Sequence, residues 1–358
     1  MIAYIEVRDK YSRLPFATIE PAECWFELAF YGVGEFQVYA RASKKALAAL
    51  QNGNYISLPH LPFIWVIEDV HTTYAARVGY MISATGRQAK AILGKRIINT
   101  QTQLPKDLTT AVFELIRKNA GAEAGEVRKI DGLEELTSTI VQTITETQVS
   151  YENLLTYTDD LLHAYKFGSE LTITNAAAFR YNLLSGVDKS DEIIFSQTFD
   201  NLLSSSYRRN AASVRNFALI GGQGEGRERI LAEYNASPSL RGIDRAEMFL
   251  DAKDISSKYT DGNGQEQELD TTTAAGLATY KGWLLERGKA KTEETVQIET
   301  FEGEIDTEAT PYKFGTDFYL GDRVRVQDDY LGAYITPRIL KFTMRQDRKY
   351  SEIVEYGE

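Results

Sequence analysis

The chain has 358 residues, of which 43% are hydrophobic and 25% charged, and a formal net charge of −11 at pH 7. This length predicts two or three domains, and this composition is that of an ordinary globular protein. The negative charge argues against a protein that grips nucleic acid through its phosphates, because that grip needs clustered Lys and Arg. The single cysteine, Cys24, excludes an internal disulfide framework, and the three scattered histidines lack metal-ligand spacing. We therefore expect no cofactor and no metal.

The chain carries no predicted membrane or export segment. Its longest apolar run, around Leu61–Ile67, is far shorter than the ~20 residues that span a bilayer. The first residues lack the basic and apolar regions of a signal peptide. We expect a soluble chain that is not exported.

Residues 1–86 show the alternation of apolar and polar side chains that is typical of β-strands, as in Glu35–Tyr39. A second apolar run covers Cys24–Phe30, and a short helix is expected over Ser43–Leu50. Several short strands separated by turn residues predict a barrel-like β domain, which we expect residues 190–222 to complete.

From Gly86 onward the apolar spacing becomes helical. We expect helices over Arg87–Ile98, over Leu108–Asn119 with Asp107 as N-cap, and over Tyr151–Tyr165 with Ser150 as N-cap. Strands are expected over Thr137–Val149 and Leu171–Leu183. Residues 87–189 are therefore predicted to form an α+β insertion.

The remaining segments complete the predicted architecture. They are a strand pair, Glu192–Phe199 with Tyr207–Ile220, a helical turn over Arg227–Asn235 and a helix over Thr271–Arg287. Residues 223–290 are interpreted as a linker with a helical segment, and residues 291–358 as a C-terminal β domain. The predicted fold class is mainly β with an α+β insertion: two barrel-like antiparallel β domains plus smaller helix-containing domains.

A glycine-rich stretch stands out between an apolar and a charged run. It contains Gly221, Gly222, Gly224 and Gly226 within six residues. A dinucleotide fingerprint needs Gly-x-Gly-x-x-Gly, and here the third glycine comes one place early. The Lys-Ser or Lys-Thr of a phosphate-binding loop is also missing. A tight structural turn is therefore the better interpretation.

Candidate catalytic groups are sparse. The adjacent carboxylates Asp159/Asp160, Glu293/Glu294 and Asp328/Asp329 cannot face one another on a strand or a helix. No Gly-x-Ser-x-Gly elbow occurs, and Cys24 lies in an apolar strand. We do not expect an enzyme.

The region 207–229 holds the main concentration of positive charge. Its arginines are Arg208, Arg209, Arg215, Arg227 and Arg229. On an acidic protein, arginines of this kind are suited to binding carboxylates of a neighbouring domain or subunit. Contact with an anion or with nucleic acid is the alternative.

Four short motifs follow one another along most of the chain. They are Gly86-Arg87 with Leu93 and Arg96-Ile97-Ile98; Gly221 to Gly226 with Arg229; Asp244-Arg245 with Phe249 and Asp251; and Tyr319-Leu320-Gly321-Asp322-Arg323-Val324. In this order they resemble the tail-hub or baseplate-hub family of siphophages and prophages, whose hub fold is shared with contractile-tail baseplates.

The resemblance implies a β-rich structural protein of a phage tail tip or baseplate. Three copies would close a ring that joins the tail tube to the host-recognition apparatus and leaves a channel for DNA. The implied partners are further copies of the chain, the distal tail protein, receptor-binding components and the tape-measure protein. DNA would pass without specific binding, and no membrane would be involved.

The same resemblance assigns the protein to the virion, after synthesis in the host cytoplasm. Because the sequence stops after the last β unit, we expect a hub without an attached hydrolase. The glycines of the 221–226 stretch, the five arginines of region 207–229, Gly321 and Asp322 are the predicted interface residues. Two alternatives stay open: a tail-associated cell-wall hydrolase, and an anion- or nucleic-acid-binding module that uses the arginines.

Overall fold

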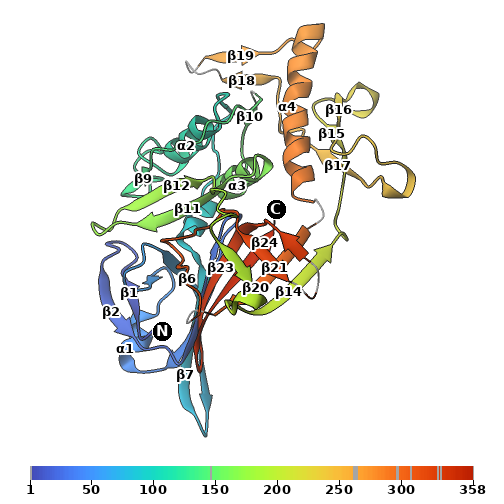
Figure 1. Cartoon of the computed structure of the whole chain (residues 1–358). Coiled ribbons are helices and arrows are strands. Elements are labelled where there is room, and N and C mark those ends of the chain that lie inside the picture. The colour runs from blue at the N-terminus through green and yellow to red at the C-terminus, as the bar shows by residue number, and fades with distance from the viewer. Residues whose placement is uncertain are drawn as a thin grey trace.

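The structure is a computed structural model that describes residues 2–357 apart from 146, 261–264, 296–297, 307–308, 329 and 331–332. Its largest element is one antiparallel sheet of eleven strands, drawn from both ends of the chain (Figure 1). In spatial order the strands are β14 (Leu202–Asn210), β20 (Ile298–Ile305), β24 (Tyr350–Gly357), β23 (Arg338–Gln346), β3 (Glu23–Ala29), β4 (Glu35–Arg41), β7 (Gly79–Gln88), β6 (Ile64–Ala75), β5 (Tyr55–Ser57), β1 (Ile5–Arg8) and β2 (Pro15–Ile19).

The centre of this sheet joins the two ends of the chain. β23 pairs with β3 from Lys341 opposite Ala29 to Gln346 opposite Cys24. The mainly β prediction is confirmed, but a pair of barrels is not. Among the described residues the sheet has two outer edges, β14 and β2, to which no further strand is hydrogen-bonded.

Alternation of side chains along the strands produces the main core. β3 and β4 bury every second residue, and the rings of Phe26, Phe36 and Trp65 pack against one another on the inner face. The predicted helix over Ser43–Leu50 is α1 (Lys44–Ala49), capped by Ser43. A small sheet of β13 (Ile194–Ser196), β21 (Arg325–Asp328) and β22 (Ala333–Ile335) lies beside the C-terminal strands, and the short 3-10 helix η2 (Gln197–Phe199) follows β13.

The segment between β7 and β13 supplies most of a second hydrophobic core, to which β5 and β6 add Tyr55, Ile64 and Val66. Its elements are the 3-10 helix η1 (Ala89–Lys95), β8 (Thr102–Gln103), α2 (Leu108–Asn119), β9 (Leu133–Glu135), β10 (Gln148–Val149), α3 (Leu154–Ala164), β11 (Gly168–Ile173) and β12 (Phe179–Leu184). The prediction of α2 is confirmed, with the Asp107 carboxylate accepting from the amide of Thr110 at 2.8 Å. α3 begins later than predicted because Asn153, not Ser150, caps it.

Two strand predictions in this region are wrong. Of the segment Thr137–Val149, only β10 is a strand. Backbone groups before it make isolated hydrogen bonds, such as that from the Ile144 amide to the Lys106 carbonyl, and not a continuous ladder with one neighbouring strand. Leu171–Leu183 is not one strand but most of a hairpin, in which β11 turns back as β12. The expected α-helix over Arg87–Ile98 is the shorter 3-10 helix η1.

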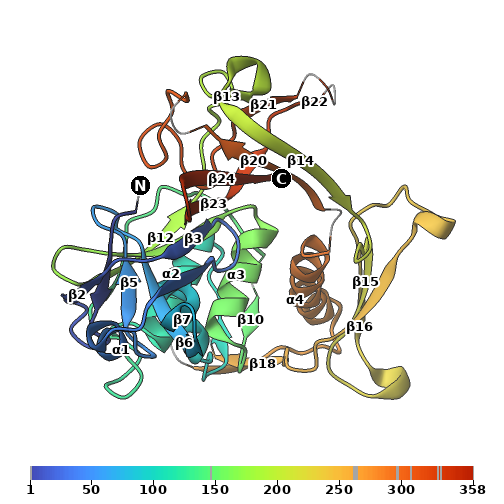
Figure 2. The ribbon, with the colours of Figure 1, turned by 90° about the horizontal axis from the view of Figure 1, so that it is seen from below.

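A third hydrophobic core belongs to residues between β14 and β20. Here β15 (Phe217–Gly221) lies between β16 (Leu231–Asn235) and β17 (Glu247–Asp251), and the long helix α4 (Ala274–Glu293) packs on this sheet. Two 3-10 turns, η3 (Gly226–Glu228) and η4 (Gly242–Asp244), and a hairpin of β18 (Lys258–Thr260) and β19 (Glu266–Glu268) complete the unit. Figure 2 shows α4 between α3 and the β15–β16 sheet.

Three expectations for this unit change. β14 and β15 are separate strands in different sheets, and neither pairs with the segment around β13. The helical turn predicted over Arg227–Asn235 is η3 only at its start, and β16 follows. α4 extends six residues beyond the predicted end at Arg287, to Glu293.

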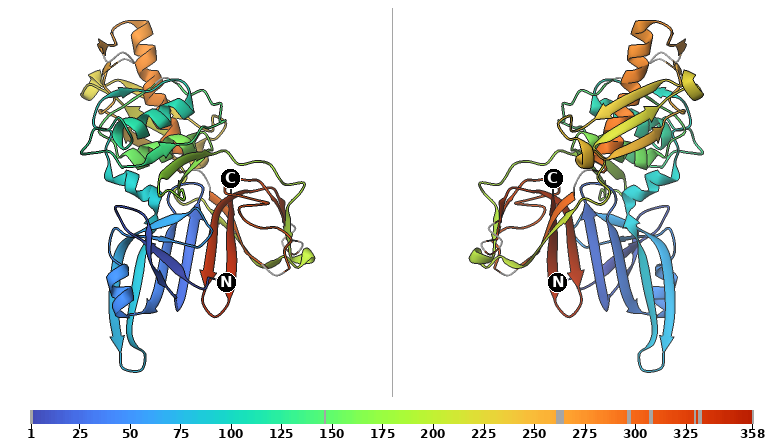
Figure 3. Two further views of the ribbon diagram at one scale, coloured as in Figure 1. Left: turned by 90° about the vertical axis from the view of Figure 1, so that its left-hand side faces the viewer. Right: turned by 90° about the vertical axis from the view of Figure 1, so that its right-hand side faces the viewer.

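The helical parts and the large sheet occupy opposite ends of the molecule. Figure 3 shows the insertion and α4 at one end and the tip of the β6–β7 hairpin at the other. No helix in the described part of the chain combines the length and apolarity needed to cross a lipid bilayer. The residue boundaries given for the predicted domains stay a prediction.

Candidate assembly surface

The glycine-rich stretch is the turn that connects β15 to β16. The Gly222 amide donates to the Ile230 carbonyl at 2.9 Å, and the Ile230 amide donates to the Gln223 carbonyl at 2.9 Å. Gly224 and Gly226 have φ angles of +95° and +55°, in the left-handed region that favours glycine. A Cβ atom on Gly222 would lie 2.7 Å from the hydroxyl oxygen of Tyr280, so any larger residue would force this contact to shift.

Polar groups of this turn are bonded to the protein itself. The Tyr280 hydroxyl accepts from the Gln223 amide at 2.8 Å and donates to the Ile255 carbonyl at 2.6 Å. The Gln223 side chain accepts from the Ser257 amide and donates to the Ser256 hydroxyl, each at 3.0 Å. This geometry is that of a packed junction between the small sheet and α4, and it supports the structural interpretation over a phosphate loop.

Arg229 is part of the same junction. Its guanidinium donates to the carbonyls of Gly221 at 2.7 Å and Gly222 at 3.1 Å. It also pairs with the Asp251 carboxylate at 2.5 Å and lies over the ring of Phe249. Arg229 therefore has a carboxylate partner in the same small sheet, on strand β17, and its pairing with a neighbouring domain or subunit stays a prediction.

The other four arginines are distributed over several elements. Arg208 and Arg209 belong to β14 in the large sheet, and Arg227 lies in η3. Arg215 lies in the connection between β14 and β15, where its guanidinium donates to the Val214 carbonyl. Arg208 and Arg227 are exposed, whereas the side chain of Arg209 lies outside the described part of the structure. The sequence cluster is thus not one pocket built on one element.

Gly321 and Asp322 form a second junction, between the exit of the insertion and the C-terminal strands. The buried Asp322 carboxylate accepts from the amides of Val187 at 2.8 Å and Tyr319 at 2.9 Å, and pairs with Lys189 at 3.3 Å. Gly321 has a φ of +86°, and its carbonyl accepts from Arg338 at 2.6 Å. These contacts hold chain segments together that are more than 130 residues apart.

A buried carboxyl ties the insertion to this second junction. Glu170 accepts from the amide of Asn182 at 3.1 Å and from the hydroxyl of Tyr319 at 2.8 Å. Burial raises the pKa of Glu170, and the two hydrogen bonds only partly oppose that effect.

This raised pKa predicts a pH-dependent gain from Glu170→Gln. As pH rises above the ordinary value of 4.5, the unfolded wild type ionises before the folded state does, so wild-type stability falls. Glutamine keeps an acceptor for Asn182 and offers a donor to Tyr319, so the variant escapes this loss. Urea unfolding at pH 5 and pH 8 should show that the free energy of unfolding of the variant, relative to that of the wild type, is higher at pH 8 than at pH 5. Parallel pH profiles would contradict the assignment.

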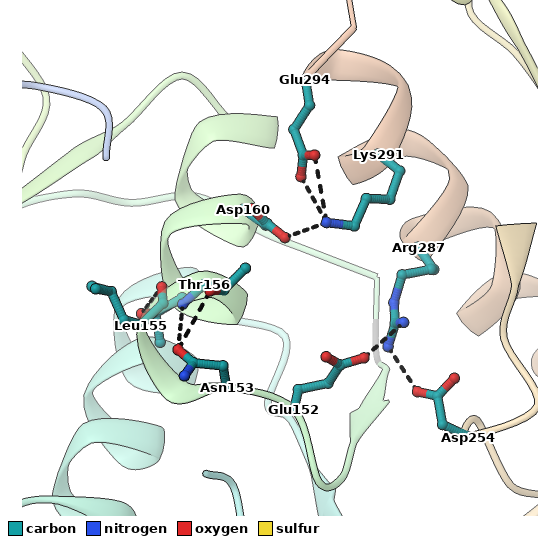
Figure 4. A network of polar contacts seen from close by, with 10 residues as sticks. Glu152, Asn153, Leu155, Thr156, Asp160, Asp254, Arg287, Lys291 and Glu294 are labelled. Atoms are coloured by element: carbon teal, nitrogen blue, oxygen red, sulfur yellow. Dashed lines mark hydrogen bonds and ion pairs between the residues drawn. The ribbon is translucent and has the colours of Figure 1, made fainter. Parts of the chain in front are cut away.

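Sequence reasoning missed a polar seam between α3 and α4 (Figure 4). Arg287 of α4 donates to Glu152 at 3.1 Å and to Asp254 at 3.0 Å. Lys291 pairs with Asp160 of α3 at 2.7 Å and with Glu294 at 3.0 Å. Burial disfavours the charge of Lys291, but the hydrogen bonds to these carboxylates raise its pKa above the ordinary value. The sequence signal that could have indicated this seam is the spacing of Arg287 and Lys291, which are four residues apart and therefore lie on the same face of the helix.

The adjacent carboxylates serve different cations. Asp159 pairs with Lys90 at 3.1 Å, whereas Asp160 pairs with Lys291. Of the pair Asp328/Asp329, residue 329 lies outside the described residues. Within the described part of the chain, no group of three or more His, Cys, Asp and Glu side chains is placed to hold a metal ion. Burial raises the pKa of the Cys24 thiol to about 12, so its nucleophilic thiolate is scarce.

The chain matches a known protein family over almost its whole length. Residues 5–356 match the family described as Siphovirus ReqiPepy6 Gp37-like protein. The chain belongs to this siphovirus protein family. The resemblance to siphophage tail proteins is thereby confirmed, and the match covers all three hydrophobic cores. No curated protein sequence matches the chain.

Solved structures described as tail proteins or prophage tail proteins share the fold of this family member. The tail protein from Neisseria meningitidis MC58 has a TM-score of 0.58 at 10% identity, covering 99% of this chain and 96% of its own. The prophage MuSo2 43 kDa tail protein from Shewanella oneidensis has a TM-score of 0.56 at 13% identity, covering 99% and 98%. The prophage tail protein gp18 from Listeria monocytogenes EGD-e has a TM-score of 0.52 at 12% identity, covering 99% and 94%.

Proposed function

We propose that this protein is a structural hub of a phage tail tip or baseplate. Copies of the chain form a ring, expected to be a trimer, that joins the tail tube to the host-recognition apparatus. The observation that carries this proposal is a family match over residues 5–356 together with a fold that tail proteins share over nearly their whole length. The proposed location is the tail tip of the virion.

The open edges of the large sheet supply a physical basis for ring formation. An edge strand presents unpaired backbone groups and is a template for another chain. Large apolar side chains are exposed at both edges: Leu14 and Phe16 at β2, and Leu203 and Tyr207 at β14. Contact between the β14 edge of one copy and the β2 edge of the next is heterologous, and such contacts generate a closed ring when the rotation between neighbouring copies closes. The exposed Arg208 lies on the same edge.

A ring of this kind leaves a central channel. The net charge of −11 per chain favours the passage of DNA without trapping, because like charges repel phosphate. The tape-measure protein, the distal tail protein and the receptor-binding components are the proposed neighbours. The packed glycine turn and the Gly321–Asp322 junction would keep each subunit rigid within the assembly.

A test of the ring uses light scattering and negative-stain imaging of the purified chain. The wild type is expected to give a species of three chains with threefold symmetry. Combining Phe16→Glu with Leu203→Glu places charges at both edges and should give monomers with little change in melting temperature, since both side chains are more than half exposed.

The matched control is Val127→Glu, at a side chain that is 97% exposed and lies in the insertion. This variant should assemble like the wild type. A wild type that stays monomeric at high protein concentration would overturn the ring proposal, and intact rings in the double variant would overturn the assignment to the two edges.

A further inference from the structure

The Glu352 carboxylate lies on the core-facing side of the large sheet, which is mainly apolar but also carries Gln346 at the end of β23. In the register of β23 and β24, Glu352 is opposite Met344, two pairs away from Phe342 opposite Val354. On its other side Glu352 is opposite the buried Ile305 of β20. Side chains that occupy equivalent positions on neighbouring strands share a face, so Glu352 points to the core side. Alternation alone predicts an apolar residue there.

Glu352 borders a groove with about 440 Å³ of space. We call it the aromatic groove, and its lining comprises Leu61, Thr310, Tyr312, Lys313, Phe314, Phe342, Met344, Tyr350 and Glu352. Phe314 and Phe342 stack in parallel with their ring centroids 3.9 Å apart. A volume of this size falls within the range of small-ligand sites, and apolar walls with few polar groups are typical of them.

The aromatic groove has two charged lining residues, Glu352 and Lys313. Glu352 lies on the core-facing side of the sheet. Within the described residues, the hydroxyl of Tyr350 is the side-chain donor to the Glu352 carboxylate, at 2.7 Å. Lys313 is exposed, and its backbone amide is held by Asp317 at 2.8 Å. The charge on the core-facing side is thus the Glu352 carboxylate, in a groove that four aromatic residues help to line, whereas the charge of Lys313 is exposed.

We propose that the aromatic groove binds an arginine side chain of a partner protein. Aromatic faces attract cations through the ring quadrupole, and a carboxylate beside them adds a charge-assisted hydrogen bond. Arginine fits better than lysine because its planar guanidinium stacks on rings and pairs with a carboxylate through two donors. This inference concerns the isolated chain and does not rest on the proposed ring.

The test uses the methyl group of Met344 as the reporter. The chain contains four methionines, and Met344 lines the groove whereas Met81 and Met248 lie in other elements. Carbon-13 methyl NMR of the full-length protein is followed during titration with Nα-acetyl-arginine amide. Nα-acetyl-citrulline amide, which is neutral and of the same shape, is the matched probe. The Ile2 amide donates to the side chain of Gln346, which is paired with the groove residue Tyr350. A tag at the N-terminus would lie near the groove, so the tag is placed at the C-terminus.

The arginine probe should shift the Met344 methyl resonance and leave those of Met81 and Met248 in place, with saturation at about millimolar concentration. Glu352→Gln, which retains an acceptor for Tyr350, should weaken binding about tenfold. Lys313→Ala should bind at least as well as the wild type, because it removes a like charge from the lining of the groove.

Four results would overturn the proposal. Equal binding of the citrulline probe would show that charge is not recognised, and unchanged affinity of a folded Glu352→Gln variant would exclude the carboxylate. A lack of any Met344 shift, or tighter binding of Nα-acetyl-lysine amide, would remove the assignment to arginine. Ring formation by the same samples is measured separately, so failure of one proposal is distinguishable from failure of the other.

Discussion

Replacing Lys90 by Met is expected to lower the free energy of unfolding by about 3–5 kcal/mol, the usual cost of breaking a buried ion pair from one side. Lys90 is only 2% exposed and lies in η1, where the chain enters the insertion. Its ammonium donates to Asp159 of α3 at 3.1 Å and to the carbonyl and hydroxyl of Ser169 in β11 at 3.0 and 3.1 Å. Methionine fills a similar volume but removes the ammonium charge, and the Ser169 hydroxyl remains as a donor to Asp159 at 3.2 Å.

The matched control is Lys90→Met combined with Asp159→Asn. Removing both charges should recover most of the loss, because no uncompensated carboxylate then remains. Burial raises the pKa of Asp159 and Lys90 opposes this effect, so the single variant should raise that pKa further. Its deficit should therefore grow as pH rises from about 4 to 8. Urea unfolding measures all of these values, and a single variant no less stable than the double would contradict the assignment.

Substituting Gly222 by Ala should destabilise the fold by about 1–3 kcal/mol, as overpacking of a tight core does. The added methyl group would lie 2.7 Å from the Tyr280 hydroxyl oxygen and 3.0 Å from a methyl carbon of Leu284. Both neighbours are fully buried, so they have little room to shift. Thermal and urea unfolding report the change.

Gly282→Ala is the control within the same unit. Gly282 lies inside α4, where the nearest atom to an added Cβ is 3.8 Å away. Alanine there should stabilise the helix by about 1 kcal/mol, the opposite sign from Gly222→Ala. If Gly222→Ala were neutral, the glycine turn would not be a packed junction, and its glycines would need another explanation.

The sequence predicted a helix accurately where an N-cap residue and a row of apolar residues at helical spacing both lie within the segment. α2 matches the predicted Leu108–Asn119 because Asp107 caps it and Val112, Leu115 and Ile116 share its buried face. The spacing of the glycine turn fails the nucleotide patterns, and its hydrogen bonds to Tyr280 and Ile230 are consistent with the structural interpretation. Its partner Tyr280, however, lies 57 residues beyond Gln223 and carries no local signal.

Strand pairing was the part that the sequence could not settle. β14 was expected to pair with a neighbour in sequence, but its partner β20 begins at Ile298. The alternation of apolar and polar residues in β14 does not identify β20 as its partner, because strand pairing depends on tertiary packing. The polar seam of α3 and α4 and the aromatic groove were missed for the same reason. Each is built from segments that meet only after the chain has folded.

The pairing of β3 with β23 has a consequence for synthesis in the cell. Gln346 must be made before it can pair with Cys24, which lies 322 positions earlier. At about 5–20 residues per second, one edge of β3 waits roughly 15–60 seconds for its partner. A chain that terminates early therefore cannot complete its main sheet. Only a chain translated through β23 can therefore close the sheet at its centre.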